Sequence, residues 1–229
     1  MKLQIHLLKL MKMSKICALV SGGLDSSVML YELSKNFTEV YPLYIKFGLY
    51  WEKAEIYWLK KFLVKLKNKN IKKLKILEIK AKDMYNGHWS ITGKNIPDEK
   101  SSDDKVYIAG RNILLLSIAS VFCEKNGVST IGIGVLKSNP FKDASKKFFS
   151  AAKNTLSIGL NRKIKVVTPF SNYTKDGLIA KYCNLPLKLT FSCINPIGNR
   201  HCGKCNKCYE RRIYFKKAGI EDNTVYKNL

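Results

Sequence analysis

A segment with the letters SGGLDSS, at residues 21–27, follows the short apolar run from Ile16 to Val20. Such a run is typical of a strand that is buried on both faces, and open α/β sheets bind ligands where their strands end. Two glycines let the backbone approach an anion closely, and the amides and dipole of a following helix attract phosphate. The segment therefore predicts a phosphate-binding loop.

The side chains of this loop add further donors. Three serine hydroxyls can donate hydrogen bonds to phosphate, and the carboxylate of Asp25 can cap the helix or help to hold a magnesium ion. The segment is neither a Walker loop nor a G-x-G-x-x-G motif, because the required lysine and glycine positions are absent. The simpler interpretation is a capped helix after a glycine turn. We expect the ATP contacts to lie in one continuous run, formed by Val20, Ser21, Gly22, Gly23, Leu24, Asp25, Ser26, Ser27, Val28, Met29 and Leu30.

A second cluster of reactive residues consists of Cys193, Cys202, Cys205 and Cys208. Two short Cys-x2-Cys steps place three sulfur atoms around one point, and the longer loop returns the fourth. Four thiolates without an open position are typical of a structural zinc site. His201 is an alternative ligand, and an iron–sulfur cluster is an alternative occupant.

The other three cysteines, Cys17, Cys123 and Cys183, are isolated among apolar residues and are predicted to be inert core thiols. An odd number of cysteines with one tight cluster indicates metal thiolates in a reducing compartment rather than a disulfide framework. The opening residues contain lysines and no small-residue cleavage site, so they predict a tail rather than a signal. No uninterrupted apolar run reaches the length of a membrane span, and we expect a cytoplasmic protein.

The elements that must position these groups alternate along the chain. Predicted strands cover residues 16–20, 40–45, 74–79, 130–135 and 164–167, and predicted helices cover residues 26–33, 51–66, 112–123, 143–156 and 174–182. This alternation predicts an α/β, Rossmann-like fold in which a parallel sheet carries helices on both faces. Residues 81–109 have no regular pattern, and so long a loop in a compact domain is usually functional.

The chain has 229 residues, of which 46% are hydrophobic and 25% are charged, as in ordinary globular proteins. Its last forty or so residues become rich in Cys, Asn, Gly and Arg. We therefore predict a tail at residues 1–14, an ATP-binding α/β domain at residues 15–185, and a small helical zinc module at residues 186–229.

The formal charge of +24 favours anionic ligands, including polyanions such as tRNA. Only five of the 41 basic residues are arginine, and lysine is spread along every segment. Such a distribution is typical of a solvated surface rather than a nucleic-acid-binding stripe. Direct nucleic-acid binding is therefore not expected, although it stays an alternative.

The SGGLDSS loop resembles the SGGxDS signature of the ATP-pyrophosphatase, or PP-loop, superfamily, whose fold is of the adenine nucleotide alpha hydrolase type. In that superfamily the loop grips the β,γ-pyrophosphate and leaves the α-phosphorus open to attack. The resemblance therefore implies adenylation with release of pyrophosphate, and the missing Walker lysine agrees with that.

Further segments resemble the 7-cyano-7-deazaguanine (preQ0) synthase family. The letters FSC at 191–193, CGKCNKC at 202–208 and ER at 210–211 are similar to its C-terminal zinc module. The letters YIAGRN at 107–112 are similar to its (V/Y)-x-P-G-R-N segment, and NPFKD at 139–143 stands where it carries a substrate loop. These blocks keep one order over nearly the whole chain.

The chain also departs from that family on the substrate side. The letters FGLYW at 47–51 replace the family's Tyr-Gly-Gln-(Arg)-His, Ala109 replaces a proline, and DAS at 143–145 replaces an aspartate-cysteine-arginine run. The ATP and zinc motifs are intact. The resemblance is therefore to a somewhat divergent member, and it supports adenylation more strongly than the identity of the acid.

The resemblance implies an ATP-dependent ligase that converts 7-carboxy-7-deazaguanine and ammonia to 7-cyano-7-deazaguanine, in queuosine- or archaeosine-type biosynthesis. It also implies one structural zinc ion per chain, magnesium with ATP, and a homodimer. We expect catalytic roles for Asp25 and Arg111. The expected substrate contacts are Arg111, Asn112, Lys142 and Asp143. A flat heterocycle could also stack on Trp51, His88 or Trp89.

Two other functions are compatible with parts of the sequence. A tRNA-modifying PP-loop enzyme, of the thiolation or lysidine type, would use the same loop. Sulfur transfer needs reactive cysteines outside the metal site, which the predicted core thiols do not supply. A non-catalytic nucleic-acid-binding zinc protein would leave the phosphate loop without a purpose.

Overall fold

Five parallel strands form one sheet in residues 13–227, the part of the chain that the computed structural model describes. The order across the sheet is β3-β2-β1-β4-β5. The strands are β1 (Met13–Leu19), β2 (Phe37–Lys46), β3 (Lys75–Glu78), β4 (Thr130–Gly132) and β5 (Lys165–Val167). From β1 the chain adds β2 and β3 on one side, and it then returns to add β4 and β5 on the other side of β1. The strand order therefore reverses between β1 and β4, and this position is the topological switch point of the sheet. The predicted fold class is confirmed.

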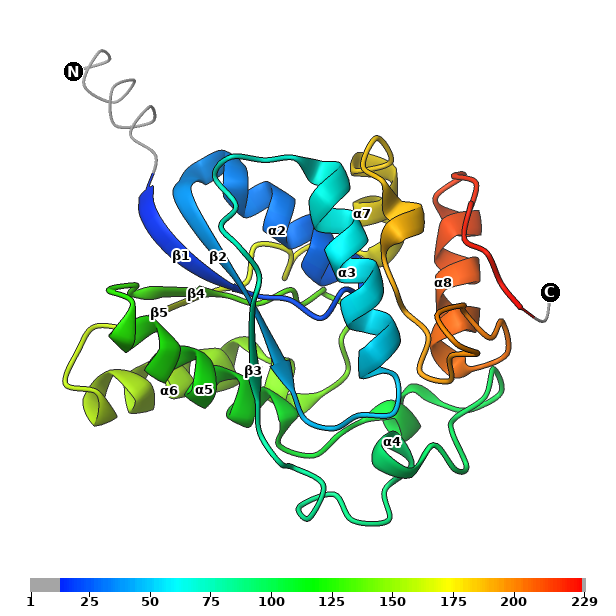
Figure 1. Cartoon of the computed structure of the whole chain (residues 1–229), viewed down its shortest axis with the longest axis horizontal. Helices are drawn as coiled ribbons and strands as arrows, with labels where there is room; N and C mark the ends of the chain where they lie inside the picture. The colour runs from blue at the N-terminus through cyan, green and yellow to red at the C-terminus, as the bar shows by residue number, and fades with distance from the viewer. Residues whose placement is uncertain (1–12, 228–229) are drawn as a thin grey trace.

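Helices cover both faces of this sheet, as Figure 1 shows. On one face lie α2 (Leu24–Asn36), α3 (Glu52–Leu66) and α7 (Lys175–Lys181), and on the other lie α5 (Arg111–Lys125) and α6 (Lys146–Gly159). Side chains alternate along β1 because successive residues of a strand point to opposite faces. Ile16 and Ala18 therefore pack with α2, while Cys17 and Leu19 pack with α5.

Several boundaries differ from the predicted ones. The strand β1 begins at Met13, which pairs with Phe37, so the last two residues of the predicted tail belong to the sheet; residues 1–12 lie outside the described part. The predicted irregular stretch 81–109 contains the helix α4 (Trp89–Thr92) and the 3-10 helix η1 (Asp103–Val106). Two further 3-10 helices are η2 (Lys142–Ala144) and η3 (Leu187–Leu189). The helix α6 starts only at Lys146, because η2 precedes it.

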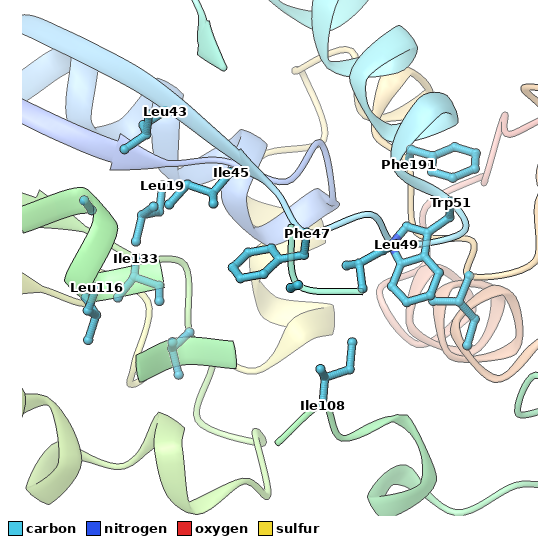
Figure 2. Packing of buried hydrophobic residues seen from close by; sticks show 14 of the residues in the cluster. Leu19, Leu43, Ile45, Phe47, Leu49, Trp51, Ile108, Leu116, Ile133 and Phe191 are labelled. Atoms are coloured by element: carbon cyan, nitrogen blue, oxygen red, sulfur yellow. The ribbon is translucent and has the colours of Figure 1, made fainter. Parts of the chain in front are cut away.

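The C-terminal cysteine region and α8 (Asn206–Lys217) pack on the sheet domain rather than standing apart. One continuous apolar cluster includes Leu19, Phe47, Leu49 and Trp51, which Figure 2 shows. The same cluster contains the four clustered cysteines. The amide of Phe191 donates to the carbonyl of Gly22 at 2.7 Å. The predicted zinc module therefore shares its core with the ATP-binding domain.

One stretch of the described chain, Asp103–Lys125, is long and apolar enough to cross a membrane by length and composition. In the fold, Leu116, Ala119 and Cys123 are buried against the sheet. The core helix of a globular domain passes the same test. We therefore assign this stretch to the core.

Candidate active site

A cavity of about 320 Å³ opens where β1 and β4 end, at the switch point of the sheet. Its walls come from the SGGLDSS loop, the first turns of α3 and α5, residues 138–141, and α7 and α8. The carboxyl ends of parallel strands meet at this edge, which is where open α/β sheets bind ligands. The predicted phosphate loop, Arg111 and the two candidate stacking residues Trp51 and Trp89 are thereby brought to one site.

The backbone of the loop turns sharply at Gly22, whose φ is +80°. A Cβ atom at this residue would lie 2.9 Å from the carbonyl oxygen of Glu55 and 3.3 Å from the Cβ of Leu59, both on α3. Only glycine adopts this conformation at low cost and leaves room for so close an approach. The turn therefore packs directly against α3.

Hydrogen bonds within the loop hold its shape. The amide of Ser21 donates to the hydroxyl of Ser26 at 3.1 Å, and the amide of Gly23 donates to the hydroxyl of Ser21 at 3.3 Å. The helix begins with the bond from the amide of Ser27 to the carbonyl of Gly23. Among the described residues, the first three amides of α2, at 24–26, have no partner. They remain available to an anion at the positive end of the helix dipole.

The predicted ATP-binding run divides into two groups. Those that line the cavity are Ser21, Gly23, Leu24, Asp25 and Ser26. Those that lie outside its lining are Val20, Gly22, Ser27, Val28, Met29 and Leu30, and all of these are buried. The second group fixes the loop on the sheet and does not face the cavity.

Four charged side chains form a chain of ion pairs along the cavity wall. Asp25 Oδ2 lies 3.6 Å from Nζ of Lys175, which lies 2.6 Å from Oε1 of Glu210, whose Oε2 lies 2.7 Å from Nζ of Lys207. Burial opposes the charged form of Lys175, but Asp25 and Glu210 outweigh it and hold its pKa above the ordinary value. The pairs therefore keep a cation beside the phosphate loop.

The second oxygen of Asp25, Oδ1, is buried and has no hydrogen-bond partner among the described residues. Burial raises the pKa of this carboxyl, against the opposing effect of Lys175. Asp25 does not cap α2, so that part of the prediction is wrong. A buried carboxylate oxygen that lacks a partner fits a hard cation such as magnesium, which prefers oxygen ligands.

The substrate side of the cavity contains Arg111, the first residue of α5. Its Nε is buried without a hydrogen-bond partner, and the described residues offer no carboxylate within 4.0 Å of its guanidinium. This cation is thus available to an anionic ligand. The sequence also allows a simpler interpretation of Arg111, as a helix-start arginine in a surface ion pair, but the described residues provide no such pair.

The other three predicted substrate residues, Asn112, Lys142 and Asp143, do not line the cavity. Asn112 donates from Nδ2 to the backbone carbonyl of Asp143 at 2.9 Å, which ties α5 to η2. The side chain of Asp143 is buried, and burial raises its pKa. Residues 138–141, just before them, reach the cavity instead.

Aromatic side chains form one end of the cavity. The rings of Trp51 and Trp89 are stacked, with centroids 5.5 Å apart and planes 19° from parallel. Figure 2 shows Trp51 beside Leu49 in the apolar cluster. His88 is not part of the lining, because its Nδ1 interacts with the Ser90 hydroxyl at 2.8 Å and accepts from the Ser90 amide to cap α4.

The four clustered cysteines are all buried, and their sulfur atoms lie within 4.8 Å of one another. The Sγ atoms of Cys202 and Cys208 are 3.9 Å apart, and those of Cys193 and Cys205 are 3.8 Å apart. Zinc–sulfur bonds of about 2.3 Å in a tetrahedron place the sulfur atoms roughly 3.8 Å apart, so one ion of that size fits. Backbone amides at 195, 202 and 205 donate to sulfur at 3.3 Å, which favours thiolates.

His201 does not join this cluster. Its Nε2 accepts a hydrogen bond from the amide of Ser192 at 3.1 Å, and its ring packs against Phe191 and Tyr226. The nitrogen that a metal would need is therefore engaged by the backbone. His201 is a buried packing residue.

The remaining cysteines correct one expectation. Cys17 and Cys123 are fully buried as predicted, but Cys183 is exposed. It follows α7, where the preceding Tyr182 fills the core position and turns the next side chain to solvent. None of these three thiols lines the cavity.

Sequence reasoning did not find Lys175 and Lys207 as cavity residues, and it noticed Glu210 only as part of a motif. They lie about 150 to 185 positions beyond Asp25 and reach it through the packing of α7 on α8. Lys207 lies within the CGKCNKC letters, but those letters predict a metal site and not a cavity residue, and no local pattern distinguishes Lys175 from other lysines. The proximity of Lys175 and Lys207 to the loop depends on tertiary structure alone.

A comparison with protein families supplies the identity of this arrangement. The model described as "Queuosine biosynthesis protein QueC" matches residues 15–219. The chain belongs to the QueC family. The match spans both the phosphate loop and the four cysteines, so both features of the site are features of a QueC chain.

Individual relatives agree with this family. The chain is 34% identical over 203 residues to "7-cyano-7-deazaguanine synthase 1" of Desulfitobacterium hafniense, covering 86% of this chain and 90% of that protein. It is 31% identical over 224 residues to the 7-cyano-7-deazaguanine synthase of Leptospira interrogans, covering 91% and 89%.

Among solved structures, the U34-tRNA thiolase NcsA of Methanococcus maripaludis, with its [4Fe-4S] cluster, is similar in fold. The TM-score is 0.52 at 15% identity, and the match covers 91% of this chain and 69% of that one. At this identity the likeness concerns the fold alone.

Proposed function

We infer that this chain is a 7-cyano-7-deazaguanine synthase, an ATP-dependent ligase that joins the nitrogen of ammonia to 7-carboxy-7-deazaguanine and yields the nitrile. Membership of the QueC family and about 30% identity to curated synthases over most of the chain support this function. The observation that carries the mechanism is the cavity in which free loop amides, Lys175 and Arg111 surround one site. This combination can hold a nucleotide and an acid together.

The chemistry requires activation of a carboxylate, which is a poor electrophile because loss of its oxygen is unfavourable. Attack of the carboxylate on the α-phosphorus of ATP makes an acyl adenylate and releases pyrophosphate. Ammonia then displaces AMP and forms the amide. A second adenylation, at the amide oxygen, allows that oxygen to leave with AMP and gives the nitrile. No enzyme nucleophile is needed, so the site must act by positioning and by charge stabilisation.

The loop residues have the first role. The free amides at the start of α2 would hold the terminal phosphates, and the Lys175 ammonium would stabilise the charge that develops on the pyrophosphate. The buried Oδ1 of Asp25 is suited to magnesium bound with ATP, which would neutralise phosphate charge. The SGGLDSS loop contains no lysine, so Lys175 of α7 would supply the positive charge beside the phosphates.

Arg111 and the two stacked tryptophans have the second role. The unpaired guanidinium of Arg111 would bind the carboxylate of the acid or a nucleotide phosphate. Trp51 and Trp89 would pack against the flat deazaguanine ring at the apolar end of the cavity. Asn112 and Asp143 would act indirectly, by fixing η2 beneath residues 138–141.

Zinc is the ion that we propose for the four cysteines. The closed donor set leaves no open position, so the ion would stabilise the fold rather than take part in the reaction. It would hold Phe191, whose amide binds the Gly22 carbonyl, and the start of α8, which carries Lys207 and Glu210. We also propose a cytoplasmic location and a homodimer.

The decisive experiment incubates the purified protein with ATP, magnesium, ammonium and 7-carboxy-7-deazaguanine. We expect AMP, pyrophosphate and the nitrile, all dependent on the acid. AMP release that depends on tRNA and not on the acid would refute the assignment. No thiol outside the four-cysteine cluster lines the described cavity, so no feature there favours sulfur transfer.

A further inference from the structure

Glu55 is a buried acidic residue in the cavity wall, and the proposed binding of ATP and of the acid does not use it. It lies in the first turn of α3, it is one of the residues that line the cavity, and it is only 7% exposed. Its own carbonyl oxygen lies directly under Gly22 of the phosphate loop. Glu55 and the phosphate loop therefore border the same cavity, in which the acid would be activated.

The surroundings of this carboxylate contain no ion-pair partner. The hydroxyl of Tyr44 donates to Oε2 at 2.6 Å, and the Trp51 side chain lies next to the carboxyl group. No lysine or arginine nitrogen within residues 13–227 lies within 4.0 Å of it. A buried carboxylate without a counter-ion is costly unless it is protonated or a cation comes to it.

Three charged or titratable groups face Glu55 from the neighbouring elements: Tyr44 on β2, Glu52 on α3 and Arg111 on α5. Burial raises the pKa of Glu55 to about 7, while Arg111 and the Tyr44 hydroxyl act in the opposite direction and Glu52 adds to the rise. Near neutral pH this carboxyl group therefore exists in both forms. It is able to accept a proton and to release it within a catalytic cycle.

The reaction consumes ammonia, which in neutral water is almost entirely ammonium. Ammonium cannot attack a carbonyl until it loses a proton, because its lone pair is occupied. A site that uses free ammonia must therefore attract the cation, strip its water and remove one proton. A buried, unpaired carboxylate beside an aromatic face has the properties for the first two steps.

We propose that Glu55 forms the ammonium subsite of this enzyme and acts as the base that frees the nitrogen lone pair. The proposal rests on the proposed function. One proton moves from ammonium to the Glu55 carboxylate, and the freed lone pair forms a bond to the carbonyl carbon of the acyl adenylate. The bond from that carbon to the adenylate oxygen then breaks, and AMP leaves with the second proton on its phosphate.

The test compares Glu55→Gln with the unmodified protein. Glutamine keeps an oxygen for the Tyr44 hydroxyl, but it cannot hold a cation or accept a proton. We expect kcat/KM for ammonia to fall about 100-fold or more, as is typical for loss of a general base. The acid-dependent exchange of pyrophosphate into ATP, which needs no ammonia, should change by less than about twofold.

Hydroxylamine separates the proposed role from a structural one. It is a neutral nucleophile near pH 7, so it needs neither an anionic subsite nor a base to free its lone pair. The Glu55→Gln variant should form the hydroxamate at close to the rate of the unmodified protein. Equal losses with both nucleophiles, or an unchanged kcat/KM for ammonia, would overturn the subsite.

Glu39 provides a control, because it also accepts a hydrogen bond from a tyrosine hydroxyl of β2. Glu39 accepts a hydrogen bond from the hydroxyl of Tyr41 at 2.7 Å, but it lies outside the cavity lining and pairs with Lys72. Glu39→Gln should leave the ammonia kinetics unchanged, and a loss equal to that of Glu55→Gln would overturn the proposal. If the unmodified protein shows no acid-dependent exchange at all, the proposed function itself fails, and the subsite fails with it.

Discussion

The phosphate loop packs closely against α3 at Gly22, and the replacement of Gly22 by alanine has two separable costs. The first is the left-handed conformation, with φ of +80°, which costs an L-residue about 1–2 kcal/mol. The second is crowding, because the new Cβ would lie 2.9 Å from the backbone oxygen of Glu55. Crowding of a packed interior typically costs about 1–3 kcal/mol.

The two costs can be measured apart with Gly48, which has the same φ of +80°. Apart from its chain neighbours, no atom of the described residues lies within 4 Å of the position that its Cβ would take. Gly48→Ala should show the conformational cost alone. Gly22→Ala should lose about 2 kcal/mol more, which for a chain of this size lowers Tm by roughly a further 4–8 °C. Thermal unfolding of both variants, in the same buffer and with zinc retained, gives the comparison.

Gly23 provides a third variant that addresses binding rather than stability. Its φ is −66°, and a Cβ would approach only the Ser21 hydroxyl, at 3.2 Å, and the Phe191 carbonyl, at 3.7 Å. Gly23→Ala should melt near the unmodified protein and yet bind ATP more weakly, because the methyl group enters the cavity lining. If Gly22→Ala and Gly48→Ala melt within about 1 °C of each other, the packing argument is wrong.

Three further variants test the rest of the site. Cys205→Ser should lose the metal and lower Tm, since the binding energy of a structural site is also folding energy; an unchanged metal content with an unchanged melting curve would contradict this. Asp25→Ala should abolish pyrophosphate release with the fold intact, because Lys175 still pairs with Glu210; near-normal release under saturating magnesium would disprove the role of the carboxylate. Trp89→Ala should raise KM for the deazaguanine acid by about 5- to 100-fold, as expected when a base loses a stacking partner. KM for ATP should stay within about twofold of its unmodified value. Equal effects on both substrates would show that the Trp89 ring only packs.

The pH dependence of the ammonia reaction follows from Glu55. The group must be ionised to act, so activity should be low below its pKa of about 7 and rise through that value. Tyr44→Phe removes the hydrogen bond that favours the ionised form and should move this rise to higher pH. The profile with hydroxylamine should lack that movement.

The motifs that sequence predicted correctly are those whose geometry is local. The apolar run to Val20, the two glycines and the start of α2 are contiguous, so the loop forms from short-range backbone preferences and from burial of the strand. The four cysteines lie within residues 193–208, and short Cys-x2-Cys turns suffice to bring three sulfur atoms together. The alternation of strands and helices likewise predicted the parallel sheet.

The substrate side shows why the same reasoning was less successful there. Asn112 and Asp143 were expected to touch substrate, but their hydrogen bond joins two elements 31 positions apart. The rotation of each helix about its axis decides which polar residue faces the cavity and which one stabilises the cavity wall. A stretch of sequence does not contain that information.

Sequence alone therefore determined the strand–loop–helix arrangement of the glycine loop, the four-cysteine cluster and the class of fold. Tertiary structure decided which charges meet at the site. It brought Lys175 to Asp25, left Arg111 without a carboxylate partner in the described part of the chain, and packed Glu55 against Gly22. The physical reason is that these contacts join distant segments, and their energies arise from burial and from Coulomb interactions that exist only once the helices have packed on the sheet.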